Sequence, residues 1–370
     1  MEHEFTGQIQ QVLASAFGEA WEDIYGKSPL LQYLNIKTKS ATRGAKARGS
    51  FANIYAIYVL VEDYLTNSFD KRKDYSDYEG ARFIDLFRRQ RELPFGSKLQ
   101  NHALNSRMNE EFKKYFPQVE YVPILRDVQT NRYWINENLL KVRAGGETHN
   151  IAQAIVEIID LYAEAKRSTF KQFIETCARL KSVTAEGDST VKNFISELLA
   201  PNVDARIFEI MSYAILKFYY HDQTVYFGYD AESIQEENLK LYKTGRTNAN
   251  DGGIDFVMRP LGRFFQVTET LDVRKYFLDI DKIEHYPISF VIKSEEAIGE
   301  LKRKLHEGAQ RQYSIKAIVE KYMNCIEEII NLAILRQRFT EATAQGYLRD
   351  ILDEIIRQSR VEFNYDEVAE

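Results

Sequence analysis

Two features are scarce in this sequence of 370 residues: cysteine, which occurs twice, and long apolar runs. Cys177 and Cys325 lie far apart, without a Cys-x-x-Cys motif or a suitably spaced histidine, which argues against a disulfide framework and a structural zinc site. No stretch approaches the roughly 20 apolar residues of a membrane-spanning helix, and residues 1–6 are acidic, unlike a secretory signal. We therefore expect a protein of the reducing cytoplasm that does not enter a membrane.

The sequence also lacks a glycine-rich phosphate-binding loop of either the GxGxxG or the GxxxxGK[ST] type, and it has no internal repeat. Hydrophobic residues make up 44% and aromatic residues 13% of the chain, which excludes a largely disordered protein. We expect four regions: a mainly helical region over residues 1–150, a helical connector over 151–201, an α/β core over 202–293, and C-terminal helices over 294–370.

Positive charge is concentrated in one segment, although the net charge of the chain is -6. Residues 35–115 contain 16 Lys and Arg against 10 Asp and Glu. Within this segment is a loop-like stretch without an acid, whose basic residues are Lys37, Lys39, Arg43, Lys46 and Arg48. Such a stretch favours contacts with the phosphates of a nucleic acid, although a solvated surface loop has the same composition.

Two helices joined by a tight turn are expected next, over residues 80–92 and 97–116. The first ends in basic residues suited to phosphate contacts, namely Arg88, Arg89 and Arg91. The second carries polar residues that can read base edges in the major groove, namely Gln100, Asn101, Asn105 and Arg107. We predict that this region recognises DNA; the alternative is an ordinary polar face on a core helix.

The region with the clearest chemical content is residues 202–293. A helix with Glu209 in its first turns is followed by two strand-like segments, residues 254–258 and 263–267, which are separated by four turn residues. This pattern predicts a β-hairpin.

The register of that hairpin can be derived from its turn. If Met258 pairs with Arg263, then Asp255 faces Gln266, and Thr268 lies on the same face because side chains alternate along a strand. Oxygen ligands on adjacent strands suit Mg²⁺, which binds through one or two carboxylates together with water and phosphate oxygens. A turn that enters a strand would give a similar acidic sequence without any metal.

The order of four short motifs resembles the catalytic core of the PD-(D/E)xK nucleases, and is most similar to their Mrr-like branch. The motifs are Phe208-Glu209, Thr244-Gly245, Asp251-Gly252-Gly253-Ile254-Asp255 and Phe265-Gln266-Val267-Thr268. The resemblance covers about a quarter of the chain, residues 202–293. It implies an α/β (α+β) fold, with a mixed central sheet flanked by helices.

By this resemblance, Asp255 would bind Mg²⁺, Glu209 would assist at the metal or its water, and Gln266 would take the place of the second acid. Thr268 stands where the family has a catalytic lysine. Either Thr268 and Glu269 work with the metal alone, or a cation comes from elsewhere in the chain. The nearest candidates in sequence are Lys243, Arg274 and Lys275.

The whole arrangement resembles a type II restriction endonuclease, which would hydrolyse phosphodiester bonds of double-stranded DNA at a specific sequence with Mg²⁺-activated water. Cutting both strands of a palindrome would require a homodimer, and we expect an apolar helix around Ile326–Leu335 as its surface. Three alternatives stay open: a modification-dependent or structure-specific nuclease of the same fold, a catalytically silent DNA-binding protein, and a helical interaction protein.

Overall fold

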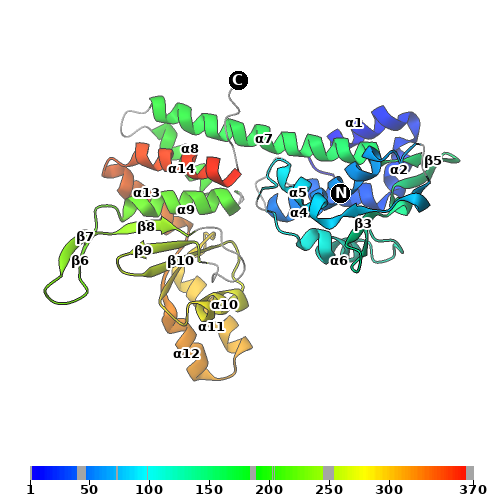
Figure 1. Cartoon of the computed structure of the whole chain (residues 1–370). Helices are drawn as coiled ribbons and strands as arrows, with labels where there is room; N and C mark the ends of the chain where they lie inside the picture. Colours follow the sequence, from blue (N-terminus) through cyan, green and yellow to red (C-terminus); the bar gives the residue numbers. More distant parts are fainter. Residues whose placement is uncertain are drawn as a thin grey trace. The chain divides into compact units, whose positions relative to one another are not determined.

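The computed structural model describes residues 2–39, 47–71, 74–97, 99–183, 189–201, 203, 205–244 and 254–363. It divides into two compact units, Met1–Phe173 and Ile174–Glu370, and the division falls inside the helix α7 (Ala152–Val183). The chain combines helices with small sheets, as the α+β prediction requires. The two units are shown in Figure 1 and are described separately below.

The first unit is mainly helical. Besides the start of α7, its helices are α1 (Thr6–Phe17), α2 (Trp21–Lys27), α3 (Pro29–Thr38), α4 (Ala47–Thr66), α5 (Phe83–Glu92) and α6 (Met108–Tyr115). The strands β1 (Ala81–Arg82), β3 (Arg132–Ile135) and β2 (Ile124–Asp127) form a sheet in that order, and β4 (Lys141–Ala144) pairs with β5 (Glu147–Asn150). Helix α4 is central because its apolar residues, such as Ile54 and Leu60, are fully buried.

The expected second recognition helix is shorter than its sequence pattern predicts. Leu99, Gln100 and Asn101 precede it as turn and coil, a π-helical segment covers Ala103–Arg107, and α6 begins only at Met108. The chain turns tightly after α5, where a Cβ atom on Gly96 would lie 2.1 Å from the carbonyl oxygen of Gln90. A side chain at this position would force the turn open, so glycine is required there.

The second unit is built on a five-stranded mixed sheet in the order β12-β11-β10-β9-β8. The strands are β8 (Lys240–Lys243), β9 (Phe256–Arg259), β10 (Arg263–Thr268), β11 (Ile288–Ile292) and β12 (Ile326–Ile330). The pairs β8–β9 and β9–β10 are antiparallel, whereas the pairs β10–β11 and β11–β12 are parallel. The predicted β9–β10 hairpin is confirmed, with Met258 opposite Arg263 and Phe256 opposite Phe265.

Helices cover both faces of this sheet. On one side α9 (Ala205–Tyr219) packs on the strands and is itself covered by α13 (Leu332–Ala344) and α14 (Leu348–Phe363), with α8 (Ser189–Leu198) nearby. On the other side, α10 (Val273–Lys282), α11 (Ile298–Gln312) and α12 (Lys316–Cys325) build a second core with Phe290 and Ile292 of β11. A two-stranded ribbon, β6 (Thr224–Phe227) and β7 (Gln235–Asn238), extends from the sheet (Figure 1).

The expected helix over Ile326–Leu335 is wrong. Its first half is the edge strand β12, because the β-branched run of Ile326, Ile329 and Ile330 suits a strand. Asn331 then starts α13, since its side-chain oxygen accepts a hydrogen bond from the amide of Ile334 at 2.9 Å. The apolar residues that suggested a dimer surface are partly internal, because Leu332 and Leu335 are fully buried.

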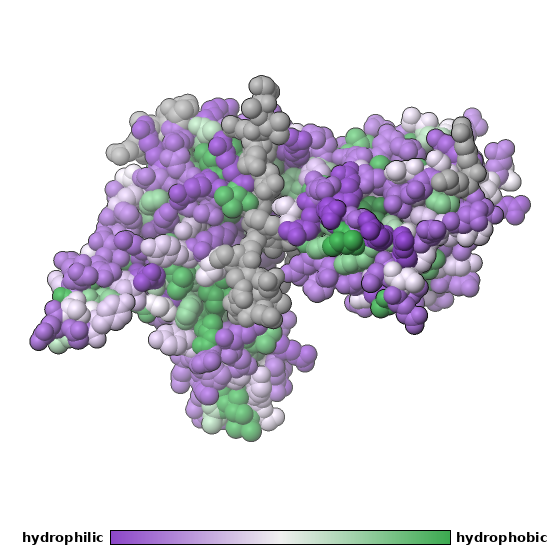
Figure 2. Space-filling model, in the orientation of Figure 1, coloured by the Kyte–Doolittle hydropathy of each residue, from purple (hydrophilic) through white to green (hydrophobic). Residues whose placement is uncertain are grey.

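Within the described residues, no helix combines the length and the apolar character needed to cross a membrane. Figure 2 shows hydrophilic residues over most of the face in view, with smaller hydrophobic patches between them. Both cysteines are buried and unpaired as disulfides, and burial raises the pKa of the Cys177 thiol to about 12. This agrees with the absence of a disulfide framework predicted from the sequence.

Candidate metal-binding site

The carboxylate of Asp255 is placed by an irregularity just before β9. The amide of Asp255 donates to the carbonyl of Phe265 at 3.0 Å, although Phe265 is already the partner of Phe256. The predicted alignment of Asp255 with Gln266 is therefore replaced by a β-bulge, in which two residues oppose one. The bulge turns the Asp255 side chain toward β10, where its Oδ2 accepts a hydrogen bond from the amide of Val267 at 2.7 Å.

The packing of the flanking residues agrees with this bulge. Ile254 belongs to the core formed with α10, whereas the ring of Phe256 lies 5.2 Å from that of Tyr213 on α9. Residues two apart in a regular strand would share a face, so the strand cannot be regular at Asp255.

Thr244, which follows β8, fixes the backbone beside this carboxylate. Its amide and its hydroxyl both donate to the carbonyl of Asp255 at 3.0 Å, and the hydroxyl also contacts the carbonyl of Ile254. The remaining motif residues, Gly245, Asp251, Gly252 and Gly253, lie outside the described residues. Thr244 thus ties the end of β8 to the position that supplies the candidate metal ligand.

The second carboxylate, Glu209, comes from α9. Its Oε1 forms an ion pair with Nζ of Lys243 at 2.7 Å, and the two side chains are 28% and 16% exposed. Lys243 reaches α9 because it lies two residues after Leu241, which is buried on the same face of β8. A helix residue and a strand residue therefore bring an acid and a lysine together.

The electrostatics connect this ion pair to Asp255. Burial, followed by the negative charge of Glu209, raises the pKa of the Asp255 carboxyl to about 8. The hydrogen bond from Val267 and the charges of Lys243 and Lys275 act in the opposite direction, but they do not outweigh burial. A divalent cation near Asp255 and Glu209 would stabilise both carboxylates in their charged forms.

Gln266 and Thr268 alternate with Phe265 and Val267 along β10 and are buried, with 6% and 4% exposure. The side-chain nitrogen Nε2 of Gln266 donates to the carbonyl of Val267 at 3.4 Å. The side chains of Asp255 and Gln266 therefore both contact the backbone of Val267. The Gln266 Oε1 atom is buried without a hydrogen-bond partner in the described part of the chain. Such an oxygen is available to a cation.

The Thr268 hydroxyl has a local role. It donates to the carbonyl of Thr270 at 3.1 Å and accepts from the amide of Thr270 at 3.4 Å. The neighbouring Glu269 forms an ion pair with Lys293, which follows β11 and is only 5% exposed. Glu269 is therefore neutralised by a buried lysine.

The donor set fits Mg²⁺ better than a softer metal. Across the described residues, no three histidine, cysteine or acidic side chains form a group that could hold a metal ion. The available donors are the carboxylates of Asp255 and Glu209 and the amide oxygen of Gln266. A hard cation that keeps several waters and binds through one or two carboxylates suits such a set.

Several residues predicted to contact DNA are engaged inside the first unit. Lys37, in α3, forms an ion pair of 2.5 Å with Glu111 and is 12% exposed. Arg89 forms a two-pronged pair with Glu62, with both distances 2.7 Å. The remaining contacts are those of Arg91 with the carbonyl of Ser97 at 2.8 Å, and of Asn105 with the hydroxyl of Tyr133 at 3.3 Å.

The other predicted DNA contacts are exposed, partly exposed or undescribed. Arg88 lies 4.0 Å from Asp85 with a side chain that is 69% exposed. Lys39, Gln100 and Arg107 are also exposed, and Asn101 is partly exposed. Arg43 and Lys46 lie outside the described residues, and only the backbone of Arg48 is described, in α4.

Lys243 was one of three cation candidates in the sequence, together with Arg274 and Lys275, and the structure pairs it with Glu209. Its sequence signal is the alternation in β8, where Leu241 and Lys243 share a face, but the pairing of β8 with β9 depends on a partner strand that lies beyond residues 244–255. The partnership of Lys243 with Glu209 could not be derived without that pairing.

Comparisons with protein-family models, with curated proteins and with solved structures give no match to this chain. The functional argument therefore depends on the chain's own residues.

Proposed function

We propose that this protein is a Mg²⁺-dependent, sequence-specific endonuclease of double-stranded DNA with type II restriction character, and that residues 202–293 form a PD-(D/E)xK nuclease core. The observation that carries the proposal is the convergence of Asp255, Glu209 and Lys243. Two acids and a lysine meet beside a β-hairpin, with the Lys243–Glu209 pair at 2.7 Å and Asp255 within reach of both charges. Metal ligands beside a cation are a combination that suits phosphodiester hydrolysis.

The roles of the residues follow from their contacts. Asp255, Glu209 and Oε1 of Gln266 would hold Mg²⁺, which supplies activation of the attacking water and neutralises charge on the phosphate. The bulge and the Val267 amide fix the Asp255 carboxylate, and Thr244 fixes its backbone. Lys243 would provide the positive charge that Thr268 cannot, because a hydroxyl is neutral. The Thr268 hydroxyl is instead hydrogen-bonded to Thr270.

DNA binding is proposed for the first unit, whose segment 35–115 carries the excess of basic residues. Within it, Arg88 and Arg107 are exposed and are the best placed of the predicted contacts, whereas Lys37 and Arg89 serve internal ion pairs. A homodimer, in which two active sites cut two strands, is part of the same proposal.

The test compares the wild-type protein with Asp255→Asn and with Asp350→Asn, an exposed acid of α14 in the same unit. Each is incubated with unmethylated phage DNA in Mg²⁺ and in EDTA, and the products are separated on a gel. We expect discrete Mg²⁺-dependent fragments from wild type and Asp350→Asn, and none from Asp255→Asn. Cleavage by Asp255→Asn at the wild-type rate would refute the site.

A second candidate function is a DNA-binding protein without nuclease activity. It is favoured by Thr268, because a hydroxyl in place of the family lysine carries no charge. This candidate predicts salt-dependent DNA binding with no Mg²⁺-dependent nicking of supercoiled plasmid. Intact plasmid together with measurable DNA binding would favour it over the endonuclease.

A further inference from the structure

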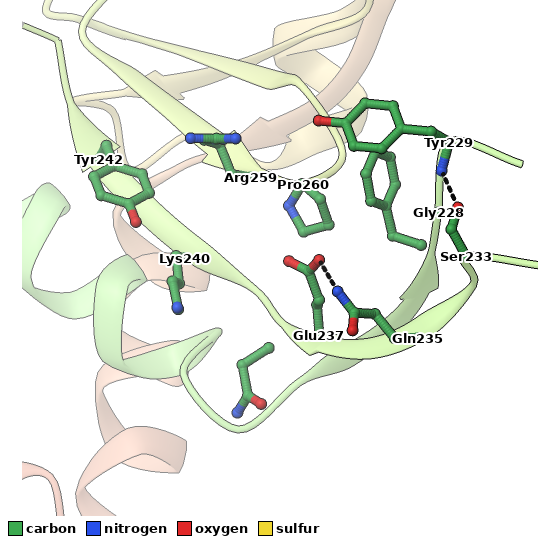
Figure 3. Close-up of a pocket in the computed structure, with 11 residues that line it drawn as sticks. Gly228, Tyr229, Ser233, Gln235, Glu237, Lys240, Tyr242, Arg259 and Pro260 are labelled. Carbon is green, nitrogen blue, oxygen red and sulfur yellow. Dashed lines mark hydrogen bonds between the residues drawn. The ribbon is translucent and has the colours of Figure 1, made fainter.

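A cavity of about 300 Å³ lies between the β6–β7 ribbon and the adjoining strands β8 and β9. Figure 3 shows its walls, with Tyr242 and Lys240 from β8 on one side and Tyr229 and Gln235 from the ribbon on the other. Neither Asp255 nor Glu209 is among the residues that line it. The cavity is thus separate from the candidate metal-binding site.

Two cationic residues that line the cavity occupy opposite positions on neighbouring strands. Lys240 on β8 is the register partner of Arg259 on β9, and both line the cavity. Neither forms an ion pair with any described residue, and both are exposed. Like charges directly opposite on neighbouring strands destabilise a sheet, so an anion bound between them would remove an unfavourable interaction.

Aromatic rings stand beside these cations. Tyr229, in the turn of the ribbon, is 91% exposed, and its ring meets that of Phe227 edge to face at 5.8 Å between centroids. Tyr242, on the opposite side of the cavity, is 46% exposed. Both rings are open to solvent, and their flat faces suit the stacking of a planar ring.

Hydrogen-bonding groups complete the lining. The carboxylate of Glu237 projects into the cavity (Figure 3) and forms an ion pair with neither cation. It lies 3.4 Å from the side-chain nitrogen of Gln235. A carboxylate accepts hydrogen bonds from the amino groups of nucleobases, while the amide of Gln235 can both donate and accept.

We propose that this cavity binds one nucleotide, with its phosphate between Lys240 and Arg259 and its base stacked on Tyr229. The volume, at the lower end of the range for ligand pockets, suits a single nucleotide. The ligand is either a free nucleotide or one unpaired nucleotide of a nucleic acid strand, since the two share this chemistry. The proposal goes beyond the endonuclease activity and does not depend on it.

The test measures binding of each of the four deoxynucleoside 5′-monophosphates by calorimetry in EDTA, so that no Mg²⁺ is present. A second arm uses a DNA duplex with one unpaired 2-aminopurine, whose fluorescence reports the environment of that base. We expect saturable binding in at least one arm. Binding in the first arm identifies a free nucleotide, and binding in the second arm alone identifies a nucleotide delivered by a strand.

Two variants remove the proposed contacts. The double variant Lys240→Gln with Arg259→Gln is expected to weaken binding by at least about tenfold, and Tyr229→Ala by about fivefold to a hundredfold. Tyr229→Phe, which keeps the ring, is expected to bind like the wild type. This rescue separates a loss of stacking from a loss of folding.

Matched controls come from the same unit. Lys302→Gln with Arg311→Gln removes two exposed cations from α11, and Tyr226→Ala removes a ring that is 77% exposed on the same ribbon but outside the cavity lining. Both controls are expected to bind like the wild type. Absence of saturable binding in both arms, or equal losses in variants and controls, would overturn the proposal.

The outcome is independent of the endonuclease test. Asp255→Asn is expected to bind the nucleotide as the wild type does. Nucleotide binding without DNA cleavage would refute only the endonuclease, and cleavage without nucleotide binding would refute only this cavity.

Discussion

The ammonium group of Lys243 lies 2.7 Å from the carboxylate of Glu209, which joins the last residue of β8 to the helix α9. Both charges act on Asp255, whose carboxyl group is held at a bulge next to the same strands. A lysine thus stands among the acids of the candidate site, although it is not at Thr268, the position that corresponds to lysine in the PD-(D/E)xK pattern.

Replacing Lys243 tests whether this lysine acts in cleavage. Lys243→Met is expected to lower the Mg²⁺-dependent rate of DNA cleavage by about 100-fold or more, because a cation facing the reacting phosphate is lost. Lys243→Arg keeps a charge and should retain more activity. Single-turnover cleavage measures both, with DNA affinity as the control, and a Lys243→Met rate equal to wild type would exclude the role.

Removing Mg²⁺ should lower the stability of the second unit. A ligand that binds only the folded state at 100 times its Kd stabilises it by about 2.7 kcal/mol. Thermal unfolding in Mg²⁺ and in EDTA should therefore differ for wild type and for Asp350→Asn, but not for Asp255→Asn. An equal Mg²⁺ effect on Asp255→Asn would place the metal elsewhere.

Two basic residues of the first unit should behave in opposite ways. Lys37→Met leaves Glu111 half-buried without its cation, so we expect a loss of about 1–3 kcal/mol in unfolding free energy. Arg88→Ala should leave the unfolding free energy unchanged. It should remove about one phosphate contact and so lower the slope of log affinity against log salt by about 1. Urea unfolding and binding at several salt concentrations separate the two, and a stable Lys37→Met protein would contradict the structure of this pair.

The opposed cations of the cavity predict a stabilising substitution. Lys240→Gln removes the repulsion from Arg259, so the protein without ligand should become more stable by less than about 1 kcal/mol. Lys302→Gln changes an exposed lysine of α11 that lies outside this strand pair, so it should not raise the stability. Thermal unfolding without nucleotide measures the difference, and a lower melting temperature for Lys240→Gln would argue that its charge has an unrecognised partner.

A pH effect is expected at Asp279 of α10. Burial raises the pKa of this carboxyl, which is 4% exposed, and the nearby charges of Lys282 and Lys275 only partly oppose the shift. Because the pKa is higher in the folded state, the folded protein binds this proton more tightly than the unfolded chain does. The free energy of unfolding therefore falls as pH rises above the ordinary pKa of 3.8. Asp279→Asn should therefore gain stability over wild type as pH rises above 3.8, until the Asp279 carboxyl of the folded protein has lost its proton. Urea unfolding at several pH values tests this, and a pH-independent difference would count against it.

Much of the fold was predictable because the relevant signals are local. The turn after Met258, for example, set the register with Arg263. The strand β12 was missed because its five residues, isoleucines and glutamates, are too short a run to tell the apolar period of a helix from that of a strand. Only its position beside the buried β11 decides for a strand.

The candidate site was predictable in its residues but not in its geometry. Asp255, Gln266 and Glu209 are marked by motif order, whereas the bulge depends on the packing of Ile254 and Phe256 on opposite sides of the sheet. The DNA-contact predictions were weakest, because composition cannot distinguish an exposed arginine such as Arg88 from one held in an ion pair, such as Arg89.

The position of β8 at the end of its sheet has a further consequence, for solubility. One side of this strand pairs with β9, and among the described strands none pairs with the other side, which leaves backbone groups available to a second chain. The strand is only four residues long, and it begins and ends with lysine, Lys240 and Lys243. Charged, short edge strands resist joining another sheet. Lys240, whose side chain is exposed, therefore also discourages this edge from pairing with another sheet, and a protein without that charge would be more prone to aggregate.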